Sequence, residues 1–165
     1  MLFISGELMR CMISVLVENK FGVLARISTL FAARGFNIDS LSVGETEDPE
    51  ISRMIIVVKG DGCILEHVTK QLNKLVDVIK VSEFNSAEYI ERESCLVKIS
   101  LNKSNRSEII NIVEIFRSKI VDISRSSIIV EVIGSENKIN TFVKKVMCYG
   151  IKEMCRTGII ALNRC

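Results

Sequence analysis

The feature that most constrains the fold of this chain is an order of predicted strands and helices that occurs twice. Segments rich in Ile and Val, which together supply 41 of the 165 residues, predict strands because branching at Cβ favours extended backbone. Between these segments apolar residues recur at helical spacing, as in the stripe from Val23 to Phe31. Residues 9–83 and residues 94–165 each follow the order β-α-β-β-α-β. We therefore predict an α+β fold of two consecutive ferredoxin-like sandwiches.

The boundaries of the predicted elements follow from the same patterns and from turn residues. In the first half, the predicted strands are 11–17, 37–44, 51–59 and 76–81, with one helix opened by Gly22 and ended by Gly35 and a second at 65–75. In the second half, the predicted strands are 95–101, 120–124, 127–133 and 151–162, with one helix at 107–119 and another that Ser135 caps. Residues 84–93 are more polar and are predicted to be a linker. Residues 1–8 are predicted to be a leader before the first domain.

One strand bears on assembly. The run Ile55-Ile-Val-Val58 is apolar at four consecutive positions, which predicts that both faces of this strand are covered. An antiparallel sheet with helices on one face leaves its other face and its edges in need of cover, and dimerisation is a common solution. We therefore expect a homodimer.

The composition weighs against several classes of protein. Lys and Arg number 22 and Asp and Glu number 20, so the formal net charge is +2, unlike the basic face of a nucleic-acid binder. Aromatic residues make up only 5%, which leaves few rings for stacking on bases. The apolar runs are far shorter than the ~20 residues of a membrane helix. The first residues lack the features of a secretory signal, so we expect a reducing, biosynthetic compartment, either a bacterial cytoplasm or a plastid stroma.

The sequence predicts neither a catalytic group nor a metal site. The six cysteines form no C-x-x-C pair and His67 is the only histidine, so a zinc site lacks ligands. We expect His67 to be solvated or packed on its helix, and cysteines without an adjacent base are poor nucleophiles at neutral pH. The acidic residues at 45–50 lack the spacing of a calcium loop, which predicts a solvated turn.

The segment around Gly22 is the candidate ligand site. Free amides at the start of a helix, with the helix dipole behind them, suit a small carboxylate, and a residue without Cβ lets a ligand approach the backbone. Asn19 precedes this helix and Asn37 follows it, and an amide side chain both donates and accepts hydrogen bonds. From these residues alone a simpler interpretation stays open, in which Asn19 is a plain helix cap and Gly22 a turn residue.

Longer patterns add a resemblance to a known family. The motifs Asn-x-x-Gly-Val-Leu-x-Arg at 19–26 and Arg-Gly-Phe-Asn-Ile-x-Ser-Leu at 34–41 resemble the ACT-domain family of amino-acid sensors. From about Met9 to Arg164 the chain more closely resembles the regulatory small subunits of acetolactate synthase, also called acetohydroxyacid synthase. The segments that carry this closer resemblance are 48–54, 70–78, 91–93, 96–99, 115–117, 120–122 and 156–158.

The resemblance implies a regulatory role without a catalytic centre or cofactor in this chain. In that family the partner is a catalytic large subunit, which carries thiamine diphosphate, a divalent metal such as Mg²⁺, and FAD. The small subunit raises the activity of this enzyme, which acts in branched-chain amino acid biosynthesis, and confers feedback inhibition, usually by valine. Leucine and isoleucine are the other candidate effectors.

The resemblance also implies which residues bind valine. Backbone amides at Gly22, Val23 and Leu24, with Asn19 alongside, would hold the carboxylate. Two further residues, Asn37 and Ile38 of the partner chain, would hold the ammonium group and line the side-chain pocket. The first domain (9–83) would sense valine, form the dimer and activate the large subunit.

Two other hypotheses about function compete with this interpretation. A free-standing ACT-type regulator of another enzyme or of transcription would need a further catalytic or DNA-binding segment. A ferredoxin-like RNA binder would display aromatic residues on its central strands, where this chain has aliphatic runs such as Ile128-Ile-Val130.

Overall fold

The computed structural model describes residues 9–60, 62–84 and 89–164. The predicted leader and part of the predicted linker lie outside these residues. The chain divides into two compact units, one that ends at Ile90 and takes in the C-terminal residues from Ala161, and one from Glu91 to Ile160. Each unit is described by itself.

The first unit is built on a four-stranded antiparallel sheet. Its strands are β1 (Met9–Glu18), β2 (Ile38–Glu45), β3 (Ile51–Gly60) and β4 (Val78–Glu83). The strand order is β2-β3-β1-β4, so the two central strands are β1 and β3 and the two edges are β2 and β4. The order in space differs from the order in sequence, which is the signature of the ferredoxin-like sandwich.

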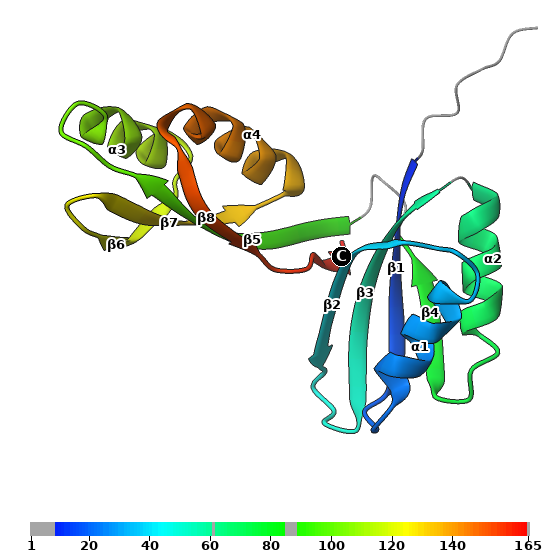
Figure 1. The fold of residues 1–165 in the computed structure, drawn as a ribbon. Helices are drawn as coiled ribbons and strands as arrows, with labels where there is room; N and C mark the ends of the chain where they lie inside the picture. Colours follow the sequence, from blue (N-terminus) through cyan, green and yellow to red (C-terminus); the bar gives the residue numbers. More distant parts are fainter. Residues whose placement is uncertain (1–8, 61, 85–88, 165) are drawn as a thin grey trace, which may run out of the picture. The chain divides into compact units, whose positions relative to one another are not determined.

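Two helices pack on one face of this sheet (Figure 1). They are α1 (Val23–Ala32) and α2 (Gly62–Leu72). Glycines with positive φ lie at both ends of α1, Gly22 at +83° as its N-cap and Gly35 at +69° after its last turn. L-residues rarely adopt this backbone conformation, so these two glycines set where the helix begins and ends, as predicted.

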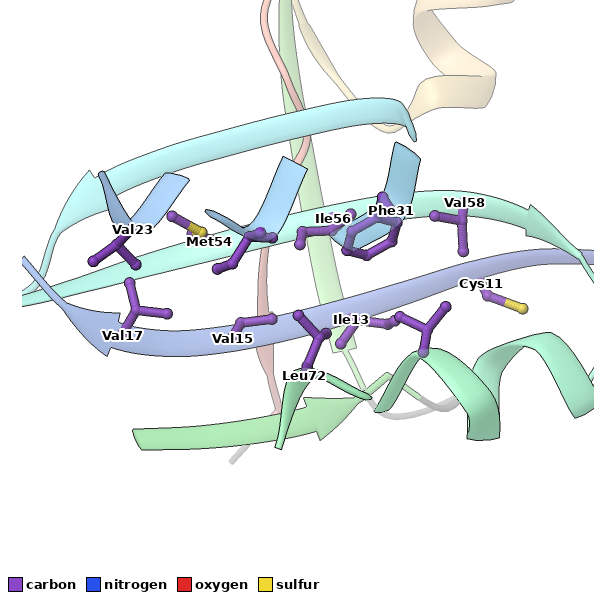
Figure 2. Packing of buried hydrophobic residues seen from close by; sticks show 12 residues of the cluster. Cys11, Ile13, Val15, Val17, Val23, Phe31, Met54, Ile56, Val58 and Leu72 are labelled. Carbon is purple, nitrogen blue, oxygen red and sulfur yellow. The ribbon is translucent and has the colours of Figure 1, made fainter. Parts of the chain in front are cut away.

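The core of the first unit lies between the helices and the sheet. Val23 at the start of α1 packs with Val17 of β1 and Met54 of β3, whereas Phe31, near the end of the helix, lies toward Val58 (Figure 2). All of these side chains are buried. The apolar stripe recognised in the sequence thus holds α1 against the central strands.

The run Ile55–Val58 is buried on both faces, as predicted. Ile56 and Val58 face the helices, and Ile55 and Val57 face the other side, where Ser14 and Met12 are their partners in β1. The argument for a dimer therefore rests on the sheet edges.

The second unit repeats the same plan. Its strands are β5 (Tyr89–Ser100), β6 (Lys119–Ile123), β7 (Ser127–Gly134) and β8 (Ile151–Arg156), whereas most of the short strand β9 (Ile160–Asn163) falls in the first unit. The order is β6-β7-β5-β8, with β9 paired to β5 off this path. Its helices are α3 (Arg106–Ile115) and α4 (Glu136–Val146), followed by the short 3-10 turn η1 (Met147–Tyr149). Ser135 caps α4 by accepting from the Lys138 N–H, as predicted.

Several element boundaries differ from the sequence prediction. The strand predicted at 76–81 begins at Val78, and the helix predicted to reach 119 ends at Ile115. Two further differences are larger. Strand β5 begins at Tyr89, so residues 89–93, which the polarity of the sequence assigns to the linker, are strand. The polarity is misleading because Glu93 is buried and accepts two hydrogen bonds from the Arg156 guanidinium. Arg156 Nε donates to Oε1 at 2.5 Å, and Nη2 donates to Oε2 at 2.9 Å. The single strand predicted at 151–162 is two strands, since residues 157–159 interrupt it before β9.

Candidate functional site

The start of α1 offers backbone amides that the protein itself leaves unused. Gly22 is the N-cap and provides no side-chain cap, and the N–H groups of Leu24 and Ala25 meet no acceptor among the described residues. The Val23 N–H reaches Lys20 O at a long 3.4 Å. A Cβ built on Gly22 would meet nothing within 4 Å, so the space beside this turn is open. These amides can bind a small anion.

Asn19 is not the cap of this helix. Its Nδ2 donates to Pro49 O at 2.9 Å and to Glu45 Oε1 at 3.2 Å, and its backbone N–H donates to Glu50 O at 2.7 Å. The simpler interpretation of Asn19 as a plain helix cap is therefore wrong. Its side chain instead joins the end of β1 to the turn between β2 and β3, beside the free amides of α1.

Asn37 and Ile38 lie at the other end of α1. The helix has ten residues, so about 15 Å separates its two ends. Ile38 begins β2 and is the register partner of Val58, whereas Glu45 ends β2 opposite Ser52, on the side of Asn19. Within one chain Asn19 thus lies three residues before Gly22, at the same end of α1 as the amides of Val23 and Leu24, and Asn37 and Ile38 lie at the opposite end.

Two residues of strand β2 were not assigned to the ligand site from the sequence. Val43 lies on the helix-facing side of the edge strand β2, opposite the core residue Met54, yet it is 44% exposed. Glu45 holds Asn19 in place. The sequence predicts a strand here, but only the strand order shows that it lies at the edge of the sheet.

The charges around this turn are arranged in pairs. Lys20 Nζ donates to Glu18 Oε2 at 2.8 Å, and this hydrogen bond raises the pKa of the Lys20 ammonium. Arg26, in the first turn of α1, forms an ion pair with Asp77, whose side chain is only 12% exposed. Asp77 O also accepts from the Glu18 N–H at 2.9 Å. The connection between α2 and β4 is therefore bonded both to Glu18, before the turn at 19–22, and to Arg26, after it.

In the described part of the chain, the histidine, cysteine and acidic side chains considered from the sequence do not gather into a reaction centre. Among the residues the structure describes, no cluster of His, Cys, Asp and Glu could hold a metal ion. His67 is exposed and its ring lies 6.1 Å from that of Phe36, edge to face. The acidic turn is organised by Asp48, whose Oδ1 accepts from the Glu50 N–H. No helix in the described part of the chain is long and apolar enough to cross a membrane.

Comparison with known families assigns both halves of the chain. Residues 13–80 match the model described as "AHAS small subunit-like ACT domain". Residues 92–165 match the model described as "Small subunit of acetolactate synthase". The first match runs from within β1 to within β4, so it includes Asn19 and the free amides of α1.

Individual proteins agree over nearly the whole chain. The Archaeoglobus fulgidus protein named "Probable acetolactate synthase small subunit" is 52% identical over 94% of this chain and 98% of its own length. The Aquifex aeolicus acetolactate synthase small subunit is 47% identical over 96% and 83%. The chain belongs to the small-subunit family of acetolactate synthase. The crystal structure of the small subunit from Thermotoga maritima has a TM-score of 0.89 and 42% identity, covering 95% of this chain and 98% of that one.

Membership of this family confirms the predicted fold and the predicted regulatory role. The first unit is an ACT domain and the second unit is the C-terminal domain of the small subunit. The protein is thus a regulatory subunit that associates with the large subunit of acetolactate synthase, in branched-chain amino acid biosynthesis.

Proposed function

We propose that this small subunit activates the catalytic large subunit and confers feedback inhibition by valine, which binds between the ACT domains of two copies. The observation that carries this proposal is the division of the candidate site. The free amides and Asn19 lie at one end of α1, and Asn37 and Ile38 lie at the other. A complete site therefore needs a second chain.

The edge strand β2 supplies the geometry for such a pairing. Beyond β2 no further strand of the described chain is placed in the sheet order. If two copies pair antiparallel through β2 about a two-fold axis between Leu41 and Ser42, Ile38 of one chain faces Glu45 of the other. Glu45 is the residue that holds Asn19. This pairing carries Asn37 and Ile38 across the roughly 24 Å length of the strand to the partner's free amides.

The chemistry of the completed site suits an α-amino acid. The valine carboxylate would accept from the amides at Gly22, Val23 and Leu24, with the helix dipole behind them. The partner's Asn37 side chain and the Ile38 backbone would accept hydrogen bonds from the ammonium group. The half-exposed Val43 offers apolar surface for a branched side chain. Because the pocket is built for an aliphatic group, alanine would bind more weakly than valine, leucine or isoleucine.

Inhibition follows if valine favours one state of the complex. A site made from two chains ties ligand binding to the geometry of the dimer, and a ligand shifts an equilibrium only by its difference in affinity between the two states. Catalysis stays in the large subunit, which would hold thiamine diphosphate, Mg²⁺ and FAD, and this chain contributes no cofactor. The match of both halves to small-subunit families favours this role over a free-standing ACT regulator.

A mixing experiment tests the shared site. Gly22→Asp and Asn37→Ala are each expected to abolish or strongly weaken valine binding in a pure dimer. After the two variants are mixed and exchanged, the heterodimer has one site with both defects and one site with none. Calorimetry is therefore expected to recover valine binding in the mixture, at about one site per heterodimer.

The opposite result has a clear meaning. If the site lay within one chain, every site in the mixture would still carry a defect, and no binding would return. Wild-type protein titrated with valine, leucine, isoleucine and alanine provides the reference. A wild type that binds none of them, alone or with the large subunit, would contradict the sensor role itself.

A further inference from the structure

We propose that Phe21 and Val76, on two adjacent loops of the ACT domain, form the surface that docks into the catalytic large subunit. The inference rests on the proposed function, since it assigns the route by which the valine site reaches the enzyme. We call these two side chains with their loops the docking tip, made of residues 19–22 and 73–77.

The exposure of these two residues needs an explanation. Phe21 is fully exposed and Val76 is 90% exposed, which makes them the most exposed large apolar side chains among the described residues. A phenylalanine that is wholly exposed to water gains none of the free energy of burial, and aromatic residues are enriched at the centres of protein interfaces.

The docking tip has a fixed base. The Glu18 N–H donates to Asp77 O at 2.9 Å, and the Arg26 guanidinium pairs with the Asp77 carboxylate. These two contacts join the β1–α1 loop to the α2–β4 loop, and both loops lie at the same end of the ACT domain (Figure 1). Because the base is already ordered, less entropy is lost when the two side chains are buried in a partner.

The position of the docking tip favours the large subunit over a second copy. Strand order places β4 at the opposite edge of the sheet from β2, through which the two copies are proposed to pair. Val76 lies two residues before β4, so a copy seated along β2 leaves it uncovered. Two charged side chains beside Phe21 and Val76 are already paired, Lys20 with Glu18 and Arg26 with Asp77, and the remaining charged side chain of the tip is the exposed Lys74. The partner surface that fits is therefore an apolar pocket, and the family partner of this chain is the large subunit.

The docking tip is continuous with the ligand site. Phe21 adjoins Gly22, and Arg26 links the first turn of α1 to Val76 through Asp77. A ligand carboxylate on the amides of residues 22–24 would thus act on both loops that carry the tip. This contact supplies a physical route from valine binding to the catalytic subunit.

The test is the double variant Phe21→Ser/Val76→Ser, with Ile115→Ser as the matched control. Ile115 is 77% exposed but lies at the end of α3 in the other domain. Association with the purified large subunit, activation of that enzyme, valine affinity by calorimetry and dimer mass by light scattering are measured for each variant. We expect the double variant to bind the large subunit at least 30-fold more weakly, as for loss of a central aromatic anchor. Valine affinity and dimer mass are expected to stay at the wild-type values, and the Ile115→Ser variant to behave as wild type throughout.

Other outcomes would overturn the inference. Unchanged association and activation would show that the large subunit docks elsewhere, and loss of the dimer would assign the tip to the contact between copies. Val76→Lys places a charged side chain at an exposed position, so it is expected to leave the fold intact and to weaken association with the large subunit. This single variant tests the inference even if the double variant misfolds. If the wild type failed to bind valine, the sensor role would fall while the association assay would still decide the docking tip.

Discussion

Asn19 donates from Nδ2 to Oε1 of Glu45 across 3.2 Å, so the turn before α1 is joined to the last residue of strand β2. This contact connects the free amides of the helix to the sheet edge proposed to form the dimer. A substitution at Glu45 can therefore change ligand binding without removing any group that touches the ligand.

Glu45→Ala is expected to weaken valine binding about fivefold, because one hydrogen bond worth about 1 kcal/mol no longer holds Asn19. Glu45→Gln retains an acceptor oxygen and is the matched control, expected to bind valine as the wild type does. Calorimetry on the two variants gives the comparison. Equal affinities for Ala and Gln would show that the contact has no part in the site.

Gly22→Asp is expected to remove valine sensitivity while activation of the large subunit survives. Two carboxylates at about 4 Å repel by up to about 4 kcal/mol near a protein surface, close to a thousandfold in affinity. Gly22 has φ +83°, and both Asp and Asn tolerate this conformation better than other L-residues. Gly22→Asn thus carries the same backbone strain without the charge and is expected to retain much more of the valine response.

The measurement for Gly22 is acetolactate formation by the reconstituted complex over a range of valine concentrations. A Gly22→Asp complex that valine still inhibits at wild-type concentrations would remove this turn from the site. Loss of activation with Gly22→Asp, but not with Gly22→Asn, would instead indicate that the added charge disturbs the neighbouring docking tip.

Asn37→Ala is expected to weaken valine binding roughly 5- to 150-fold, because it leaves ligand hydrogen bonds unmade at a cost of about 1–3 kcal/mol. Asn37 Nδ2 also donates to Asp39 Oδ1 at 3.1 Å, so a local structural effect must be separated from a loss of ligand contact. Asp39→Ala removes that local bond and keeps Asn37. By calorimetry, only the Asn37 variant is expected to lose affinity, and an unchanged Asn37→Ala would exclude this residue.

Much of the fold was predictable because local signals agreed with one another. The stripe from Val23 to Phe31, the glycines at both ends of α1 and the cap at Ser135 each specify one helix boundary, and the structure follows them. The β5 start was not predictable in the same way. Glu91-Arg-Glu93 is polar as a sequence, and only the distant Arg156 on β8 makes Glu93 suitable for burial.

The candidate site was predictable in part. A glycine before an apolar helical stripe indicates free amides, and they are present. The role of Asn19 was not visible, because its partners Glu45 and Pro49 lie 26 and 30 residues away in sequence. The exposure of Phe21 and Val76 was also hidden, since pattern alone treats every apolar residue as a candidate for the core.

Arg156→Ala is expected to destabilise the second domain by about 3–5 kcal/mol, because it leaves the buried Glu93 carboxylate without its cation. Arg156 Nη1 also donates to Asn140 Oδ1 at 2.9 Å, so the pair joins β5, β8 and α4. The hydrogen bond to Glu93 raises the pKa of the Arg156 guanidinium. Urea unfolding followed by circular dichroism measures the effect. Lys152→Ala, on the same strand, is the control and is expected to cost less than about 1 kcal/mol.

Cys95 is expected to make the stability of the second domain fall at alkaline pH. Its side chain is fully buried in β5, and burial raises the pKa of the thiol above the ordinary 9.0. Above pH 9.0 the unfolded thiol loses its proton while the folded thiol keeps it, so the unfolded state binds fewer protons and stability decreases with rising pH. The decrease is about 1.4 kcal/mol per pH unit until the folded thiol also ionises.

The comparison that isolates this effect is Cys95→Ala against Val97→Ala, a buried neighbour on the same strand that has no ionisable group. Both variants are expected to be less stable than the wild type at pH 7, because each leaves a small cavity. As the pH rises from 8 to 10, the difference in free energy of unfolding between wild type and Cys95→Ala is expected to narrow. The corresponding difference between wild type and Val97→Ala is expected to stay constant. Urea unfolding at each pH gives both differences. A constant difference for Cys95→Ala would show that this thiol does not link stability to pH.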